Sequence, residues 1–241
     1  MTSLPASAYG VHPDELDHLA HGTHSDPHRI FGPHVVEGQV VIRTLRPLAD
    51  RVEIVYGSGS LAAAQRAEAA HTHNGVGTAV LETSEVPDYR ISVTYGDTTE
   101  VVDDPYRFLP QVGELDLHLI AEGRHEELWR VLGANIKRYD GPLGEVNGTS
   151  FAVWAPNASA VRLIGDFNHW QGATHAMRSL GSSGVWELFV PGVGVGARYK
   201  FEILGRAGSW RQKADPMAKA TEVPPQTASV VTESVYEWQD E

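Results

Sequence analysis

The sequence predicts an all-β protein made of two immunoglobulin-like β-sandwiches in tandem, joined by a short helical connector. Two observations predict this class. One is an internal repeat of about 110 residues within a chain of 241 residues. The other is the pattern inside each unit, where short runs of alternating apolar and polar residues are separated by turn residues. About seven short strands in about 100 residues is typical of an immunoglobulin-like sandwich.

Three pairs of segments support the repeat, because they occur in the same order in both halves of the chain. Residues 31–34 (FGPH) resemble 132–135 (LGAN), residues 44–57 (TLRPLADRVEIVYG) resemble 153–165 (VWAPNASAVRLIG), and residues 88–108 resemble 197–219. In the last pair, Tyr89-Arg90 corresponds to Tyr199-Lys200, and Asp104-Pro105 corresponds to Asp215-Pro216. We therefore expect both units to share one fold.

Periodicity and turn residues predict the elements of each unit. In the second unit, residues 151–154, 185–190 and 199–204 alternate as strands do, with glycine-rich turns between them. Residues 13–20 begin with proline and acidic residues and end before Gly22, which predicts a helix. Residues 114–132 have apolar residues near helical spacing and form the expected connector. The division is then a first sandwich at 1–113, and the connector with the second sandwich at 114–241.

Composition disfavours several classes of protein. A formal net charge of −12 without a basic cluster argues against a nucleic-acid partner. The chain has no apolar run long enough to span a bilayer and no signal-like start, so we expect a cytoplasmic protein without a membrane partner. The absence of cysteine excludes disulfides and thiolate metal sites. We expect no cofactor.

Three kinds of chemical site were weighed and disfavoured. Residues 57–62 (GSGSLA) match a G-x-G-x-x-A nucleotide motif, but the equivalent GDFNHWQGA of the second unit contains no helix start. A loop contains His21, His24, His28 and His34. A solvated loop is the favoured interpretation over a metal site, which needs three convergent ligands. No G-x-S-x-G elbow occurs, and no catalytic residue or carboxylate pair can be assigned.

A sugar-binding face is the favoured hypothesis, because all six tryptophans lie in the second half of the chain: 129, 154, 170, 186, 210 and 238. Where the second unit has Trp170 and Trp210, the first has Leu61 and Thr99. Flat indole rings at turns are suited to the apolar face of glucose, with Asn168, Lys200 and Lys213 as nearby hydrogen-bond donors. The alternative is that both tryptophans only cover the ends of the sandwich. Trp154 and Trp186 lie inside alternating strands and are expected in the core.

Long motifs resemble a known family: WAPNASAVRLIGDFNHW (154–170), GVWELFVPG (184–192), RYKFEI (198–203) and WRQKADPMAKATEVPPQTASVV (210–231). They are similar to the amino-terminal half of bacterial 1,4-α-glucan branching enzymes, whose second sandwich is a family 48 carbohydrate-binding module. By this resemblance, the two stacking tryptophans of the module correspond to Trp170 and Trp210, and its lysine corresponds to Lys200. A sugar-contacting asparagine of related modules has no match in residues 227–231.

The resemblance implies an α-glucan partner such as glycogen, and a catalytic (β/α)8 barrel of the same polypeptide. That barrel, of the glycoside hydrolase family 13 type, carries an Asp nucleophile and a Glu acid/base and retains configuration. Eight βα units need about 250 residues, so this chain cannot contain the barrel. We expect an amino-terminal part of a glycosyltransferase that is inactive alone. The alternative is a stand-alone, non-catalytic α-glucan-binding or scaffold module, and Trp170 and Trp210 could instead dock on the barrel.

Overall fold

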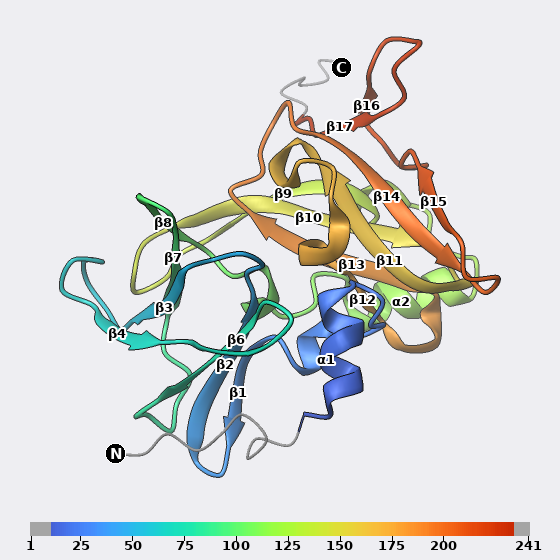
Figure 1. Cartoon of the computed structure of the whole chain (residues 1–241). Helices are drawn as coiled ribbons and strands as arrows, with labels where there is room; N and C mark the ends of the chain where they lie inside the picture. Colours follow the sequence, from blue (N-terminus) through green and yellow to red (C-terminus); the bar gives the residue numbers. More distant parts are fainter. Residues whose placement is uncertain (1–10, 234–241) are drawn as a thin grey trace.

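A computed structural model describes residues 11–233, and it shows two β-sandwiches side by side (Figure 1). Each sheet of the first sandwich has four strands, and the strands pair in antiparallel fashion. In spatial order, one sheet contains β1 (Gly32–Val36), β2 (Gln39–Leu45), β6 (Val76–Leu81) and β5 (Ala70–His73). The other contains β4 (Gln65–Glu68), β3 (Arg51–Tyr56), β7 (Tyr89–Tyr95) and β8 (Thr98–Val102). The predicted all-β class is confirmed.

The second sandwich also consists of two antiparallel sheets. One contains β12 (Arg178–Ser179), β13 (Val185–Pro191), β10 (Val146–Trp154) and β9 (Gly133–Tyr139). The other contains β11 (Ala158–Gly165), β14 (Arg198–Gly205), β17 (Ser229–Val230) and β16 (Ala220–Thr221), and β15 (Trp210–Lys213) also pairs with β14. The core of this sandwich is aromatic, because Phe151, Tyr199 and Phe201 are fully buried.

Two α-helices accompany the sandwiches and begin where the sequence predicts, but the second ends at Ala121, well before residue 132. Helix α1 (Pro13–Ala20) has proline and acidic residues in its first turn, and the His12 side chain accepts a hydrogen bond from the Asp14 backbone. Helix α2 (Glu114–Ala121) opens the connector, which turns at Gly123, where φ is +66°. Within residues 11–233, no helix is long and apolar enough to cross a membrane.

Short 3-10 turns complete the described chain: η2 (Pro27–Arg29), η3 (Pro105–Arg107), η4 (Leu128–Arg130), η5 (Asp166–Asn168), η6 (Gly172–His175) and η7 (Gly181–Ser183). The alanine-rich segment after the GSGSLA motif forms β4, where a dinucleotide site would need a helix. Trp238 lies outside the described residues.

The internal repeat is visible in the hydrogen bonds of both units. The Tyr89 hydroxyl donates to Asp104 Oδ2 at 2.7 Å, and the Tyr199 hydroxyl donates to Asp215 Oδ2. In each unit the second carboxylate oxygen accepts a backbone N–H two residues further on. Burial raises the pKa of both carboxyl groups. The same buried Tyr–Asp bond therefore ties each strand pair to the following loop.

The first sandwich has a buried core of its own, and the residues at the junction of the two units extend the core of the second sandwich. Leu16 and Leu19 of α1, together with Phe31 and Tyr106, belong to the same buried cluster as the core of the second sandwich. The Tyr106 hydroxyl donates to the carbonyls of Thr174 and Ala176, at 3.2 and 3.3 Å. A buried, hydrogen-bonded junction of this kind holds the units in one arrangement. Figure 1 shows α1 at this junction.

Candidate functional site

The outer face at strand β14 carries two of the five residues that the sequence predicts for sugar binding, Lys200 and Trp210. Tyr199 and Phe201 point into the core, so the alternating Lys200, Glu202 and Leu204 lie on the outer face. In the antiparallel register, Trp210 is opposite Leu204, and Gln212 is opposite Glu202. Directly opposed residues share a face. The structure therefore places Trp210 on the same outer face as Lys200.

Trp210 is half-buried because an arginine covers one side of its ring. The Arg162 guanidinium carbon lies 3.7 Å from the ring centroid, which is a cation–π contact. The Glu202 carboxylate accepts bonds from Arg162 Nε and Nη2 at 3.1 and 2.7 Å and so fixes the plane of the guanidinium. A further Arg162 N–H donates to the His21 carbonyl at the end of α1. The indole is thus held in place before any ligand arrives.

Trp170 is held by the turn that follows β11. His169 and Trp170 both have left-handed backbones, with φ of 52° and 61°, and the Trp170 amide donates to the Gly165 carbonyl at 2.9 Å. Two N–H groups of Arg198, each at 2.9 Å, bond the Asp166 carboxylate. Side-chain hydrogen bonds from Arg198, and to a lesser extent from Trp170, lower the pKa of Asp166. Asp166 therefore connects Trp170 to the start of β14.

Lys200 lies between these two anchors. Its ammonium donates to the Thr227 hydroxyl at 2.7 Å, which leaves further N–H groups for a ligand. Arg198, which bonds Asp166 of the Trp170 turn, and Leu204, which is opposite Trp210, are six residues apart on β14, or about 20 Å at about 3.3 Å per residue. Trp170, Lys200 and Trp210 form what we term the β14 platform.

Two predicted donors are not on the β14 platform. Asn168 is buried, and its amide closes the turn: its Oδ1 accepts from the Gly165 amide, and its Nδ2 donates to the Leu163 carbonyl, both at 2.9 Å. Lys213 is opposite Phe201 in the register, so it leaves the opposite face of the sheet. Asn168 therefore has a structural role in the turn, and Lys213 is separated from Trp210.

Sequence reasoning missed three polar residues of the outer face: Arg162, Gln212 and Thr227. Alternation along β11 could have found Arg162, because its neighbours Val161 and Leu163 are apolar. Thr227 lies in the segment without a matching asparagine, and it contacts Lys200. Its position depends on how the loop folds back toward β14, which periodicity does not predict.

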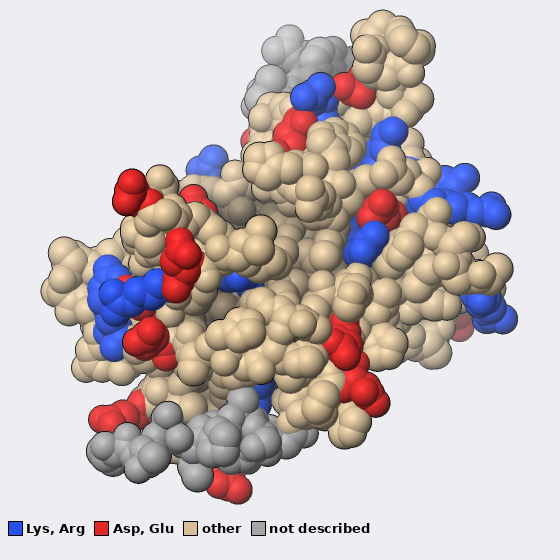
Figure 2. All heavy atoms as spheres, in the orientation of Figure 1, with Lys and Arg blue, Asp and Glu red and all other residues tan. Residues whose placement is uncertain are grey.

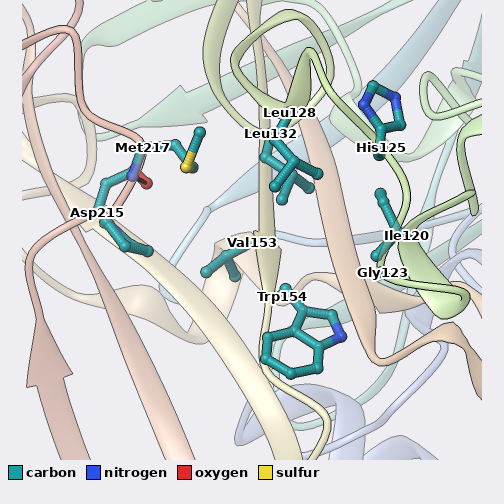
Figure 3. Close-up of a pocket in the computed structure, with 10 residues that line it drawn as sticks. Ile120, Gly123, His125, Leu128, Leu132, Val153, Trp154, Asp215 and Met217 are labelled. Carbon is teal, nitrogen blue, oxygen red and sulfur yellow. Dashed lines mark hydrogen bonds between the residues drawn. The ribbon is translucent and has the colours of Figure 1, made fainter.

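A second feature is an apolar pocket of about 380 Å³ between the connector and the end of β10. Figure 3 shows Trp154 beside it, with Leu128 of the connector and Met217 on other sides. The prediction that Trp154 is in the core is wrong, since 56% of the residue is exposed, whereas Trp186 is buried at 4%. Trp154 lies on the face of β10 that the connector covers together with Leu180 and Met217, and this cover ends before the last strand residue.

The polar groups around this pocket are already bonded within the protein. The Trp154 Nε1–H donates to the Ser183 carbonyl at 3.1 Å, and His125 Nε2 lies 3.0 Å from Asp116 Oδ1. Asp215 is engaged by Tyr199 and by the Met217 amide. The pocket therefore offers van der Waals contact and few free hydrogen-bonding groups, which suits apolar side chains better than sugar hydroxyls.

The four loop histidines have separate protein surroundings. His21 Nδ1 lies 2.7 Å from the Asp17 carbonyl, and His24 Nδ1 accepts the Asp26 amide at 3.0 Å. His34 Nε2 lies 3.1 Å from the Phe31 carbonyl, and His28 packs edge-on against Tyr106. Over residues 11–233, no group of three or more His, Asp and Glu side chains is arranged to hold a metal ion.

Comparison with known families accounts for both sandwiches. Residues 12–106 match the family described as alpha-1,4-glucan branching enzyme GlgB, N-terminal domain, and residues 131–218 match Carbohydrate-binding module 48 (Isoamylase N-terminal domain). The chain belongs to the amino-terminal region of the 1,4-alpha-glucan branching enzyme family. The resemblance predicted from the motifs is confirmed.

Relatives of this family are similar over nearly the whole chain. The 1,4-alpha-glucan branching enzyme GlgB of Thermobifida fusca is 59% identical over 228 residues, which are 94% of this chain and 30% of that protein. The GlgB of Rhodococcus jostii is 52% identical over 241 residues, which are 100% of this chain and 32% of that protein. The chain thus spans about a third of the length of these relatives.

Solved structures resemble the chain more distantly. A pullulanase from Anoxybacillus sp. LM18-11, complexed with maltotetraose, is 20% identical and covers 84% of this chain and 26% of that chain, with a TM-score of 0.35. This likeness is too low to bear on function.

Proposed function

We propose that the second sandwich binds α-1,4-glucan on the β14 platform. The observation that carries the proposal is the pre-formed arrangement of Trp170, Lys200 and Trp210. The indoles offer flat apolar surfaces for the C–H faces of glucose rings, and the lysine offers donors for hydroxyl groups. Thr227 and Arg162 hold Lys200 and Trp210 in position, so binding orders few additional side chains.

Glucan affinity electrophoresis tests the platform. We expect glycogen to retard the chain, and we expect Trp170→Ala and Trp210→Ala to abolish the retardation, because an aromatic anchor contributes about 1 to 3 kcal/mol to weak binding. Lys200→Ala should weaken it. The matched control is Trp129→Ala, since Trp129 is an exposed tryptophan of the connector and lies outside the platform. Unretarded wild-type chain at millimolar maltoheptaose would refute the proposal.

We further propose that the chain is the amino-terminal part of a branching enzyme whose catalytic barrel lies in the same polypeptide. On this view residues 1–113 form the first domain and residues 114–241 the connector with the glucan module. The length of the relatives supports this proposal, since the chain covers only 30% of the Thermobifida protein. The reading frame after residue 241 distinguishes it from a stand-alone module: barrel motifs support the first, and a stop codon supports the second.

The Trp154 pocket favours a second role, which is docking of that barrel. Trp154 is half-exposed beside an apolar cavity whose polar groups are internally bonded, whereas Arg162 covers one side of the Trp210 ring. An exposed apolar hollow of this kind is typical of a protein interface. We therefore assign docking to the pocket and sugar binding to the β14 platform.

Co-elution in size-exclusion chromatography tests the docking role. The 1–241 chain should co-elute with the separately expressed downstream part of its reading frame. Met217→Asp should prevent co-elution, because it places a charge in an apolar interface. Trp170→Ala should leave co-elution unchanged. If Trp170→Ala prevents co-elution and Met217→Asp does not, the two assignments are reversed.

A further inference from the structure

A groove of about 470 Å³ lies between the two sandwiches, next to the turn that carries Trp170. Its first wall comes from the first sandwich and includes Arg46, Leu48, Tyr95 and Glu100. Its second wall is the 167–175 turn region of the second sandwich, including His169 and Gln171. The groove is therefore built jointly by both units, whose relative arrangement is held by their buried junction.

The groove differs from the Trp154 pocket because four of its polar side chains are free. In the described part of the chain, the side chains of Tyr95, Glu100, His169 and Gln171 form no hydrogen bond or ion pair with protein. Arg46 donates one N–H to the neighbouring Leu45 carbonyl at 2.8 Å and keeps its other donors. Donors and acceptors thus surround one hollow, as a ligand rich in hydroxyl groups requires.

The apolar part of the groove includes a strained, exposed leucine. Leu48 is 94% exposed and has a φ of 63°, which is unfavourable for a branched side chain. Phe167 lines the opposite wall and stacks edge-on with His175. Apolar and hydrogen-bonding groups are therefore combined in one groove, which matches the alternating C–H and O–H surfaces of a sugar.

The charges of the groove suit a neutral ligand. Arg46 and Glu100 are the oppositely charged groups on its first wall, and Asp103 is neutralised by ion pairs with Arg90 and Arg107. On the face shown in Figure 2, acidic and basic side chains are interspersed and most of the surface is uncharged. Neither positive nor negative charge dominates that face, so its electrostatic field does not attract a phosphate or a cation.

The groove lies beside the turn that carries Trp170 of the β14 platform. His169 and Gln171 line it, and they flank Trp170 in the chain, with Cα atoms about 3.8 Å from that of Trp170. We infer that the groove is an extension of the glucan site, in which the first sandwich binds further α-1,4-linked glucose residues of a chain held at Trp170. This inference rests on the proposed sugar binding, and it gives the first sandwich a direct part in glucan recognition.

Calorimetric titration with maltotriose and maltoheptaose tests the inference on the 1–241 chain. Wild-type protein should bind maltoheptaose more tightly. Tyr95→Ala combined with Gln171→Ala should lower maltoheptaose affinity about fivefold, the loss of roughly one side-chain contact, and leave maltotriose affinity unchanged. Trp170→Ala should weaken both. Gln39→Ala is the control, because Gln39 is exposed at the far end of β2 from Leu45.

Each outcome separates the groove from the platform. If the groove variant binds both sugars as the wild type does, the inference is overturned while the platform stands. If the wild type binds neither sugar, both proposals are overturned. Amide resonances provide a second measurement: those of Tyr95 and Glu100 should shift with maltoheptaose and not with maltotriose, and equal shifts with both sugars would contradict the extension.

Discussion

The guanidinium carbon of Arg162 lies 3.7 Å from the centre of the Trp210 ring. Because Glu202 fixes the plane of the guanidinium through two hydrogen bonds, the stack sets the orientation of the indole. Lysine carries the same charge but can neither bond Glu202 in this forked geometry nor stack as a plane. Trp210 should therefore depend on arginine specifically at this position.

We expect Arg162→Lys to weaken maltoheptaose binding about two- to fivefold, the equivalent of a cation–π contact of roughly 0.5–1 kcal/mol. Tryptophan fluorescence titration measures the change. Arg211→Lys is the matched control, since Arg211 is next to Trp210 on β15 and opposite Ile203, on the other face of the sheet. Unchanged affinity in Arg162→Lys would show that the arginine only covers the ring.

The turn that carries Trp170 should require glycine at position 165. A Cβ atom at Gly165 would lie 2.4 Å from the Arg198 carbonyl oxygen and 2.5 Å from the Phe167 ring. We expect Gly165→Ala to lower the free energy of unfolding by about 1–3 kcal/mol or more through overpacking. Urea denaturation measures it. Gly194→Ala is the control, because nothing lies within 4 Å of its added Cβ, and equal stability of the two variants would contradict the steric account.

Alternation along the strands predicted which residues share a face, and the Tyr199–Lys200–Phe201 pattern is found as expected. The proline and acidic residues at its start predicted the 13–20 helix, which is also found. It could not predict what covers each face. Trp154 was expected in the core, but the connector stops short of it. The contacts of Arg162 with both Trp210 and α1 likewise depend on segments that are distant in sequence. The roles of Trp170, Trp210 and Lys200 in sugar binding stay predictions.

Glu187 shows that a charged residue can be buried in a strand whose alternating pattern predicts one apolar and one polar face. It is fully buried, and its Oε1 accepts from two N–H groups of Arg178 at 2.8 and 2.5 Å. Its Oε2 accepts the Gln111 and Val112 amides at 2.8 and 3.0 Å, which fastens the segment just before the connector. The sequence offered no signal for this bond, because Val112 lies 75 residues away from Glu187.

We expect Glu187→Gln to lower the free energy of unfolding by about 3–5 kcal/mol, because it leaves the Arg178 charge buried without its partner. Limited proteolysis should then cut the connector faster than in the wild type. Glu126→Gln changes an exposed acidic residue of the connector and is the control. Wild-type stability and cleavage rate in Glu187→Gln would show that the ion pair does not hold the connector.

His28 should make stability depend on pH. Its ring lies edge-on to Tyr106 with centroids 5.1 Å apart, and among the described residues both of its ring nitrogens are buried without a partner. Burial, with smaller effects of Arg178 and His34, lowers the pKa of His28 to about 2. In the unfolded chain its pKa is about 6.5. The unfolded state therefore binds more protons between these values, and stability falls as pH drops below about 6.5.

Between pH 7 and pH 5 this difference amounts to about 2 kcal/mol for His28. His175, whose pKa burial lowers to about 3, contributes in the same direction. His28→Phe keeps an aromatic ring beside Tyr106 and removes the titration. It should lose about 2 kcal/mol less stability than the wild type on acidification, as measured by urea denaturation at both pH values. His118→Gln, an exposed change on α2, should follow the wild type. An equal pH dependence of His28→Phe and wild type would mean that water or local opening lets His28 protonate in the folded state.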